Sequence, residues 1–498
     1  MACAGCSPPC RFPRRLRQVP DFRLRTNGWP WLGVALALKT ALSLFFVRFF
    51  LPPAEGAIPG FLGVLANDTF GYIQPVEEFL RSGNPGELFG FRMLGYGLPY
   101  LLLRLFLSQP AALNGLLVAQ TALAAFALYL LSLLAERIAG TSGAFILTFV
   151  AYLLVPIISF YDVVALPESF ATSSLVIAVY LLVKGTRRAL LVSGGCITWC
   201  VFMKPIFLPL LGLGLAHLIW VGRGRGARTV ALSGAIFLAP FAIADGLWIM
   251  GRVQSGATKD LALQPSLHPL FLDPDKHTEA LTAFLGAMGE DWQNAGWFYS
   301  GERTPCRVVT SRFDCAAVAS VQQRARATQS NLITHRPDVD RDWAVQENRR
   351  ISEELRAYAE SIRHERPGHY YGVAPLVYLA RFISASSTHR MFGDYTTMNP
   401  KLRPFRLAID SLWWLLEALF AALLVLRARR VCSTPSLALL TAIVLYFYSI
   451  YTLVFRMNDF RYLVPVLPLV VVTIACLMPE VPLERRTPRH EDRSSAES

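Results

Sequence analysis

Residues 111–134 read AALNGLLVAQTALAAFALYLLSLL and contain no charged side chain. An α-helix needs about 20 predominantly apolar residues to cross the roughly 30 Å hydrocarbon core of a bilayer, so this stretch predicts a transmembrane helix. Further apolar runs lie on both sides of it: 29–51, 142–160, 163–183, 189–203, 206–221, 228–249, 408–427, 436–456 and 460–478. The chain is therefore predicted to be an all-α polytopic membrane protein with a bundle of about ten transmembrane helices.

The composition of the whole chain agrees with this prediction. Hydrophobic residues make up 53% of its 498 residues and charged residues only 17%, whereas a typical soluble domain is about 25% charged. The formal net charge is +13, but the arginines lie beside the apolar runs. They do not form the basic face of a separate domain that nucleic-acid binding requires. We therefore expect membrane lipid around the protein and no nucleic-acid partner.

Lysine and arginine predict the orientation, because short cytoplasmic loops are enriched in them. We place the basic tail at 1–28 in the cytoplasm and let the spans alternate. The other basic clusters then all fall on the same side: Arg137, 184–188, 223–228, 427–430 and 485–486. Both termini, including the tail at 479–498, are then cytoplasmic.

Two long segments are predicted to lie outside the membrane. The first, 52–110, is an outer loop of an N-terminal module of seven spans at 29–249. Its short apolar stretch 93–107 predicts a helix in the outer interface. The second, 250–407, has the mixed composition of a soluble protein and precedes three C-terminal spans at 408–478.

Acidic and basic residues gather at the predicted outer turns. Asp68 follows the first span, and Asp162 and Glu168 lie in the next outer turn. Lys204 precedes a proline within a long apolar run, where we expect the chain to turn because both residues are costly inside a membrane. Arg461 begins the last span. Cations that hold a phosphate, beside carboxylates that take a proton from a nucleophile, suit a phosphorylated lipid substrate.

Plainer interpretations of the same residues stay open. Asp68 lies among good helix N-caps, so capping of the following helix would account for it. Asp162 and Glu168 would be solvated acids or the start of a helix. The arginines would anchor the protein to lipid headgroups. Lys204 and Arg461 would pair with Asp162, Glu168 or Asp459 and so hold the helices together.

The second outer segment has features of its own. Cys306 and Cys315 are the only cysteines in the predicted outer segments. An oxidising compartment favours a disulfide between them, and two unpaired thiols are the alternative. Apolar residues also recur at helical spacing and predict an amphipathic helix: Ile351, Leu355, Tyr358 and Ile362.

The ordered set of motifs resembles the GT-C superfamily of membrane glycosyltransferases, and is similar to its bacterial protein O-mannosyltransferases and lipid A aminoarabinose transferases. NDTFGY at 67–72 and FRMLGYGLPYLLLRLF at 91–106 resemble the family's acidic motif, R-x-P-G-Y-P sequence and interfacial helix. PESFATSSLVIAVYLLVKG at 167–185 resembles the family's acidic turn, and CVFMKPIFLPLL at 200–211 resembles its basic-proline turn. ERPGHYYGVAPLVYLARF at 365–382 resembles the helix that returns to the membrane, and NDFRYLVPVLPLV at 458–470 resembles the R-Y-x-x-P-x-x-P ending.

The resemblance implies an enzyme that transfers a sugar from a polyprenyl-phosphate donor in the outer leaflet to an extracytoplasmic acceptor. That acceptor is a glycolipid, a polysaccharide or a protein, and the membrane is the bacterial inner membrane with the active site on its periplasmic face. Asp68 matches the family's catalytic carboxylate, and Asp162 and Glu168 match its second acidic turn. The positions suited to the donor phosphate are Lys204, Arg461, Arg92 and Tyr462.

The chain also departs from the family pattern. Leu94 and Gly97 stand where the family has prolines, and the single Asp68 replaces a D-x-D sequence, which leaves the need for a divalent metal open. The competing hypotheses are a transporter or lipid flippase and a non-enzymatic scaffold. Transporters usually contain internal repeats and place charges near the bilayer midplane, whereas these charges gather at one face. A scaffold does not account for the long segment 250–407.

Overall fold

The computed structural model describes residues 28–49, 58–89, 93–254, 278–290, 298, 303–333, 341–384, 403–456 and 460–478. Within these ranges the protein is built from helices and contains no strand. Its non-helical backbone pairing is limited to isolated bridges, such as the one between Val64 and Val164. The predicted all-α class is therefore confirmed.

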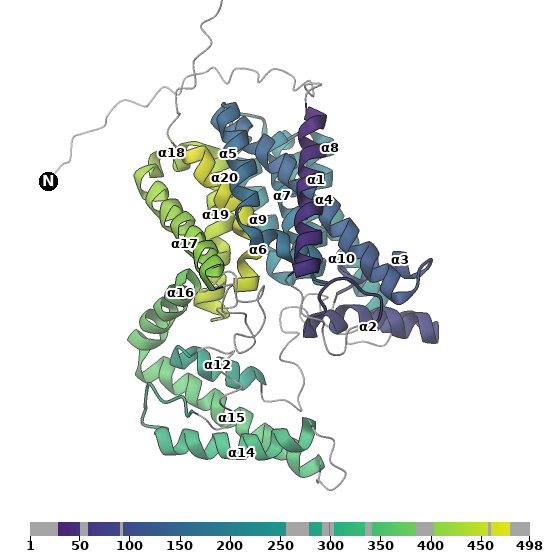
Figure 1. Ribbon diagram of the computed structural model, residues 1–498. Coiled ribbons are helices and arrows are strands. Elements are labelled where there is room, and N and C mark those ends of the chain that lie inside the picture. The colour runs from purple at the N-terminus through teal and green to yellow at the C-terminus, as the bar shows by residue number, and fades with distance from the viewer. Residues whose placement is uncertain are drawn as a thin grey trace, which may run out of the picture.

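Most helices lie side by side in one bundle (Figure 1). In chain order they are α1 (Gly28–Phe49), α4 (Gln109–Ala139), α5 (Ser142–Leu153), α6 (Pro156–Phe160), α7 (Glu168–Lys184), α8 (Arg187–Met203), α9 (Pro209–Val221), α10 (Ala227–Gln254), α17 (Arg403–Leu426), α18 (Ala428–Ser433), α19 (Pro435–Ser449) and α20 (Leu467–Leu477). Short 3₁₀ or π segments adjoin them: η2 (Tyr161–Val163), η3 (Pro205–Phe207), η8 (Ile450–Val454) and η9 (Phe460–Val466).

Six of the described helices are long and apolar enough to cross a membrane, or seven if one bent pair counts as a span. The protein is therefore a multi-pass membrane protein. The three other apolar runs form α7, α8 and α9, which contain 17, 17 and 13 residues. A count of ten spans requires these three shorter helices to cross as well. α7 is buried by its neighbours along most of its length, and such a helix tolerates the small polar residues that helix–helix contacts favour.

The predicted span at 142–160 is bent and not straight. Ser142–Leu153 and Pro156–Val163 meet at an angle of 64°. Pro156 cannot continue the hydrogen bonding of the preceding helix, but it suits the first position of a new one. The chain therefore changes direction just before the segment that carries Asp162.

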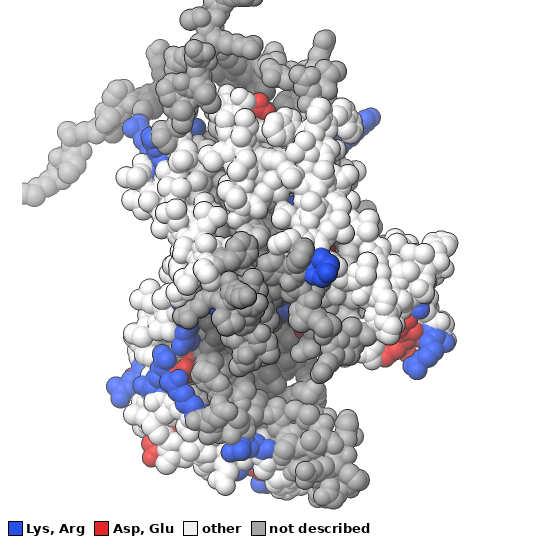
Figure 2. Space-filling model, in the orientation of Figure 1, with Lys and Arg blue, Asp and Glu red and all other residues white. Residues whose placement is uncertain are grey.

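The two ends of the bundle carry different elements. The arginine-containing α18 lies at one end. Three short helices lie at the opposite end (Figure 1), which we call the outer end: α2 (Asn67–Ser82), η1 (Pro85–Phe89) and α3 (Gly97–Arg104). Figure 2 shows charged side chains at the upper end of the molecule and over its lower half, with a mostly white region over the upper part of the bundle between them.

Beyond the outer end lies a helical unit that we call the outer module (Figure 1). It consists of α12 (Thr278–Met288), α14 (Cys315–Ile333), α15 (Arg341–Glu365), η5 (His369–Val373) and α16 (Ala374–Ser384). The predicted amphipathic helix lies in α15, and its four apolar residues are buried in a core with Phe284 and Phe313. A disulfide joins Cys306 to Cys315, whose Cα atoms are 5.5 Å apart.

Candidate active site

Five of the predicted site residues meet at the outer end of the bundle, although they are far apart in the chain. Asp68 belongs to the first turn of α2, and Glu168 begins α7. Lys204 follows α8, and Arg461 and Tyr462 lie in η9. We call these five residues the charged cluster.

Arg461 contacts both carboxylates of the charged cluster. Its Nη1 donates a hydrogen bond to Asp68 Oδ2 at 2.8 Å, and its Nη2 donates to the Tyr462 hydroxyl at 3.1 Å. Its Nε lies 3.5 Å from Glu168 Oε1. One guanidinium therefore connects α2, the N-terminus of α7 and η9.

Lys204 contacts the same glutamate. Its Nζ donates to Glu168 Oε1 at 2.7 Å and lies 5.1 Å from the centre of the Tyr462 ring. Lys204 and Arg461 thus share one carboxylate oxygen. The structure therefore brings the two cations together, as a shared phosphate site requires, and it also pairs both of them with Glu168, as the plainer interpretation expects.

The charged cluster is partly exposed. The exposed fractions of the side chains are 12% for Arg461, 15% for Lys204 and 29% for Asp68. Glu168 is only 1% exposed, and its Oε2 has no hydrogen-bond partner among the residues that the structure describes. Because a buried acceptor without a partner is costly, a ligand hydroxyl or a water that donated to Oε2 would be stabilising.

The local sequence explains how Lys204 and Glu168 reach the outer end. Pro205 has no N–H and disfavours a helical conformation of the residue before it. α8 therefore ends at Met203, and Lys204 is extended, with φ −151° and ψ 114°. Pro167 precedes Glu168 at the N-terminus of α7, where the helix dipole favours a carboxylate. Both charges lie at helix ends and not in the middle of a span.

The first turn of α2 excludes the capping interpretation of Asp68. The N-cap residue is Ala66, and its N–H donates to Thr69 Oγ1 at 2.9 Å. Asp68 lies inside the helix, and its carboxylate contacts Arg461 instead.

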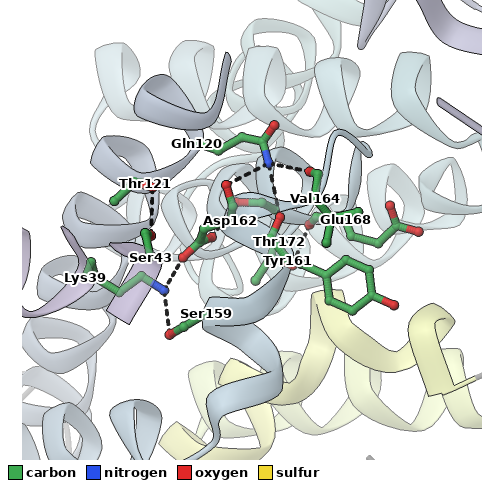
Figure 3. A network of polar contacts seen from close by, with 11 residues as sticks. Lys39, Ser43, Gln120, Thr121, Ser159, Tyr161, Asp162, Val164, Glu168 and Thr172 are labelled. Carbon is green, nitrogen blue, oxygen red and sulfur yellow. Dashed lines mark hydrogen bonds and ion pairs between the residues drawn. The ribbon is translucent and has the colours of Figure 1, made fainter. Parts of the chain in front are cut away.

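Asp162 lies apart from the charged cluster, contrary to the expectation that it joins the other acids. Its carboxylate forms an ion pair with Lys39 of α1 and accepts a hydrogen bond from Ser169 Oγ at 2.6 Å. Figure 3 shows the carboxylates of Asp162 and Glu168 pointing in opposite directions. Because the side chains of Lys39 and Asp162 are 0% and 2% exposed, a substrate does not reach this pair. The remaining predicted residue, Arg92, lies outside the described residues.

Glu77 joins α2, the helix that carries Asp68, to α3. Its carboxylate accepts hydrogen bonds from Arg104 Nε at 2.7 Å and from the Tyr100 hydroxyl. Desolvation on burial favours a higher pKa for Glu77, but these hydrogen bonds and the charge of Arg104 outweigh it and lower the pKa of Glu77 below its ordinary value. Glu77 therefore stays ionised at neutral pH and keeps the helix that carries Asp68 attached to α3.

Arg456 joins the outer module to the bundle. Its Nη1 and Nη2 donate to the carbonyl oxygens of Gly286 and Tyr370 at 2.9 and 2.8 Å, and its guanidinium lies 3.9 Å from the centre of the Tyr370 ring. Its φ of 50° is uncommon for a residue other than glycine. Arg456 thus connects α12 and η5 to the end of η8.

The charged cluster contains groups of the kinds that bind anions and accept protons. Its two cations suit a phosphate, and the exposed carboxylate of Asp68 suits a hydroxyl donor. Within the described ranges, no group of three or more His, Cys, Asp or Glu side chains is placed to hold a metal ion.

Two polar residues near the site were not singled out from the sequence, namely Lys39 and Gln120. Both lie in otherwise apolar runs. Their place inside a predicted span could have identified them, because polar groups inside a bilayer are costly and need partners.

No family model, no curated protein and no solved structure matches this chain. A function is therefore inferred from the geometry of the charged cluster.

Proposed function

We propose that this protein is a membrane-embedded glycosyltransferase that uses a polyprenyl-phosphate-linked sugar as donor. The observation that carries the proposal is the convergence of Asp68, Glu168, Lys204 and Arg461 at one end of the bundle. Four sequence-distant segments supply these side chains. Their chemistry matches the two requirements of the reaction, which are an anion site for the lipid phosphate and a base for the acceptor.

Arg461 and Lys204 bind the donor phosphate. A guanidinium offers a planar fork of N–H donors, and an ammonium offers a compact charge. Glu168 holds both cations through one oxygen, at 3.5 Å from Arg461 Nε and 2.7 Å from Lys204 Nζ. As the sugar departs, negative charge grows on the phosphate, so these cations stabilise the transition state more than the bound donor.

Asp68 acts on the acceptor. Its side chain is more exposed than the other three charged side chains of the cluster, and its carboxylate lies 2.8 Å from Arg461. An acceptor hydroxyl bound to Asp68 therefore lies beside the donor phosphate. The acceptor oxygen attacks the anomeric carbon and the bond from that carbon to the phosphate oxygen breaks. The hydroxyl proton passes to Asp68, and polyprenyl phosphate leaves with the bonding electrons.

The proposal includes ten spans and a periplasmic site in a bacterial inner membrane. If α7, α8 and α9 also cross, the basic loops at 184–188 and 223–228 lie on the same side as 427–430, as short cytoplasmic loops do. The charged cluster then faces the outer leaflet, where the acceptor is a glycolipid, a polysaccharide or a protein.

One observation bears on the transporter hypothesis. Lys39 and Asp162 form a charged pair in the bundle, and intramembrane charges often mark transport pathways. The two side chains are 0% and 2% exposed, so the pair lies on no open path. The enzyme hypothesis is therefore favoured.

The test is transfer of label from polyprenyl-phosphate sugars to cell-envelope lipids and proteins by the purified protein in detergent. We expect transfer by the wild type and its loss in Asp68→Asn, because an amide cannot take the proton. Glu78→Gln is the matched control: Glu78 lies on the same helix, is bonded to Gln74 and is outside the charged cluster. Gradient-dependent uptake into vesicles without any sugar transfer would contradict the proposal and support a transporter.

A further inference from the structure

The turn at 159–169 is attached to the segment that carries Asp68. The N–H of Ala165 donates to Val64 O at 2.9 Å. Thr69, the residue after Asp68, donates its hydroxyl to Ala165 O at 2.8 Å. The position of Asp68 therefore depends on the position of this turn.

The same turn leads directly into Glu168. Ser169, the next residue, donates its hydroxyl to Asp162 Oδ1 at 2.6 Å. Glu168 is the first residue of α7 and lies within the last residues of the turn. A shift of the turn thus moves both carboxylates of the proposed site.

Lys39 attaches this turn to α1 (Figure 3). Its ammonium pairs with the carboxylate of Asp162 and donates to Ser159 Oγ at 2.9 Å. Because an isolated charge inside a membrane is costly, the ammonium and the carboxylate stabilise the protein only when they are in contact. The pair therefore holds the turn in one place against α1.

Gln120 attaches the turn to α4 (Figure 3). Its Nε2 donates to the carbonyl oxygens of Tyr161 and Val164 at 3.1 and 3.0 Å, and its Oε1 accepts from the Tyr96 hydroxyl at 3.1 Å. Gln120 is fully buried. Backbone carbonyls in a turn lack helical partners, and Gln120 supplies the donors that a membrane environment does not.

We propose that Lys39, Asp162 and Gln120 are positioning residues, which fix the turn at 159–169 so that Asp68 and Glu168 meet Arg461. This inference rests on the proposed glycosyltransferase function. It assigns Asp162 a role through the turn, at a place that no substrate reaches.

The test compares two double variants in α1 and its partners. Lys39→Met with Asp162→Asn removes both charges together, so no charge is left unpaired, and the introduced amide keeps an oxygen for Ser169. The control is Ser43→Ala with Thr121→Val. Ser43 and Thr121 bond to each other at 3.0 Å and join α1 to α4, and neither side chain has a hydrogen bond to the turn within the described part of the chain.

The position of the turn is read independently of activity. Val64→Cys and Val164→Cys introduce a cysteine pair at the isolated bridge between these residues. Mass spectrometry of the linked peptides then measures the rate of disulfide formation. Turnover is measured per folded protein, on the monodisperse fraction from gel filtration.

We expect the Lys39–Asp162 double variant to crosslink more slowly and to lose about tenfold or more in kcat, since small misplacements of catalytic groups cost this much. The Ser43–Thr121 control keeps the wild-type crosslinking rate and kcat. Gln120→Met removes the donors without changing a charge, and we expect it to lower both the crosslinking rate and kcat. If the double variant does not fold, this single variant tests the inference.

Two results would overturn the inference. One is unchanged crosslinking in both the Lys39–Asp162 and the Gln120 variants, and the other is slower crosslinking with unchanged kcat per folded protein. Absence of sugar transfer by the wild type would instead refute the proposed function. The crosslinking rates would then still show whether these residues fix the turn.

Discussion

The Lys39–Asp162 pair and the charged cluster both join opposite charges in this bundle, but they differ in what can reach them. The side chains of Lys39 and Asp162 are 0% and 2% exposed, whereas those of Arg461 and Asp68 are 12% and 29% exposed. Both groups bring together segments that are distant in the chain. The buried pair contacts only the protein, whereas the charged cluster is partly exposed, as the proposed phosphate site requires.

This difference predicts opposite consequences of substitution. Removing one partner of a buried pair leaves an uncompensated charge and costs about 3–5 kcal/mol, whereas exposed pairs contribute about 0–1 kcal/mol. The Arg461–Asp68 pair, with side chains 12% and 29% exposed, lies between these two cases. Substitutions at the buried pair should therefore act first on stability. Substitutions at the charged cluster should act first on catalysis.

The largest expected effect is on the stability of a Lys39→Met variant. Asp162 then lacks its cation in a sealed site, and we expect the free energy of unfolding to fall by about 3–5 kcal/mol. Unfolding by SDS in mixed micelles measures this loss. Addition of Asp162→Asn should restore most of the lost free energy of unfolding. Arg461→Met should lower the free energy of unfolding distinctly less than Lys39→Met does. Equal losses for Lys39→Met and Arg461→Met would remove the distinction between the two groups.

A smaller effect is expected for Arg461→Lys. A lysine keeps the charge but not the fork of N–H donors. A hydrogen bond to a charged group contributes about 1.5–3 kcal/mol, so the KM for the donor should rise about tenfold or more. Titration of the labelled donor measures this change. Arg81→Lys, at the exposed end of α2, serves as the control, and an equal KM in all three proteins would exclude Arg461 from the phosphate site.

The smallest effect is expected in how the stability given by the contacts between α2 and α3 changes with pH. The pKa of Glu77 is lowered in the folded protein from its ordinary value of 4.5. Its stabilising contacts with Arg104 and Tyr100 are thus fully present above that value and are lost as the pH falls through the lowered pKa. Thermal unfolding should show Glu77→Gln less stable than wild type at pH 7, and the difference should shrink as the pH is lowered through that pKa. A difference that stays constant with pH would show that Glu77 does not act through its charge.

Much of the fold could be predicted from the sequence, because membrane spans are local. The apolar runs correspond to helices, and the break at Lys204 and Pro205 follows from the chemistry of proline within a membrane. Local hydropathy did not show that α7 is enclosed by other helices. It also did not show that Pro156 bends the preceding span, since that bend depends on where the next helix packs.

The candidate site was predicted in part. Asp68, Glu168, Lys204 and Arg461 were expected at one face, and the structure places them in contact. Asp162 was expected with them but pairs with Lys39. A pairing between residues so distant in the chain cannot be derived from spacing, because it depends on how α1 packs against the second outer turn.

The most direct test of the central claim separates donor binding from transfer in the charged cluster. Equilibrium binding of a labelled polyprenyl-phosphate sugar, followed by a single turnover with acceptor, is measured for the wild type, Asp68→Asn and Arg461→Gln. We expect Asp68→Asn to bind the donor at least as tightly as the wild type and to transfer no sugar, and Arg461→Gln to bind it about tenfold or more weakly. Transfer by Asp68→Asn at the wild-type rate, or undiminished donor binding by Arg461→Gln, would contradict the account.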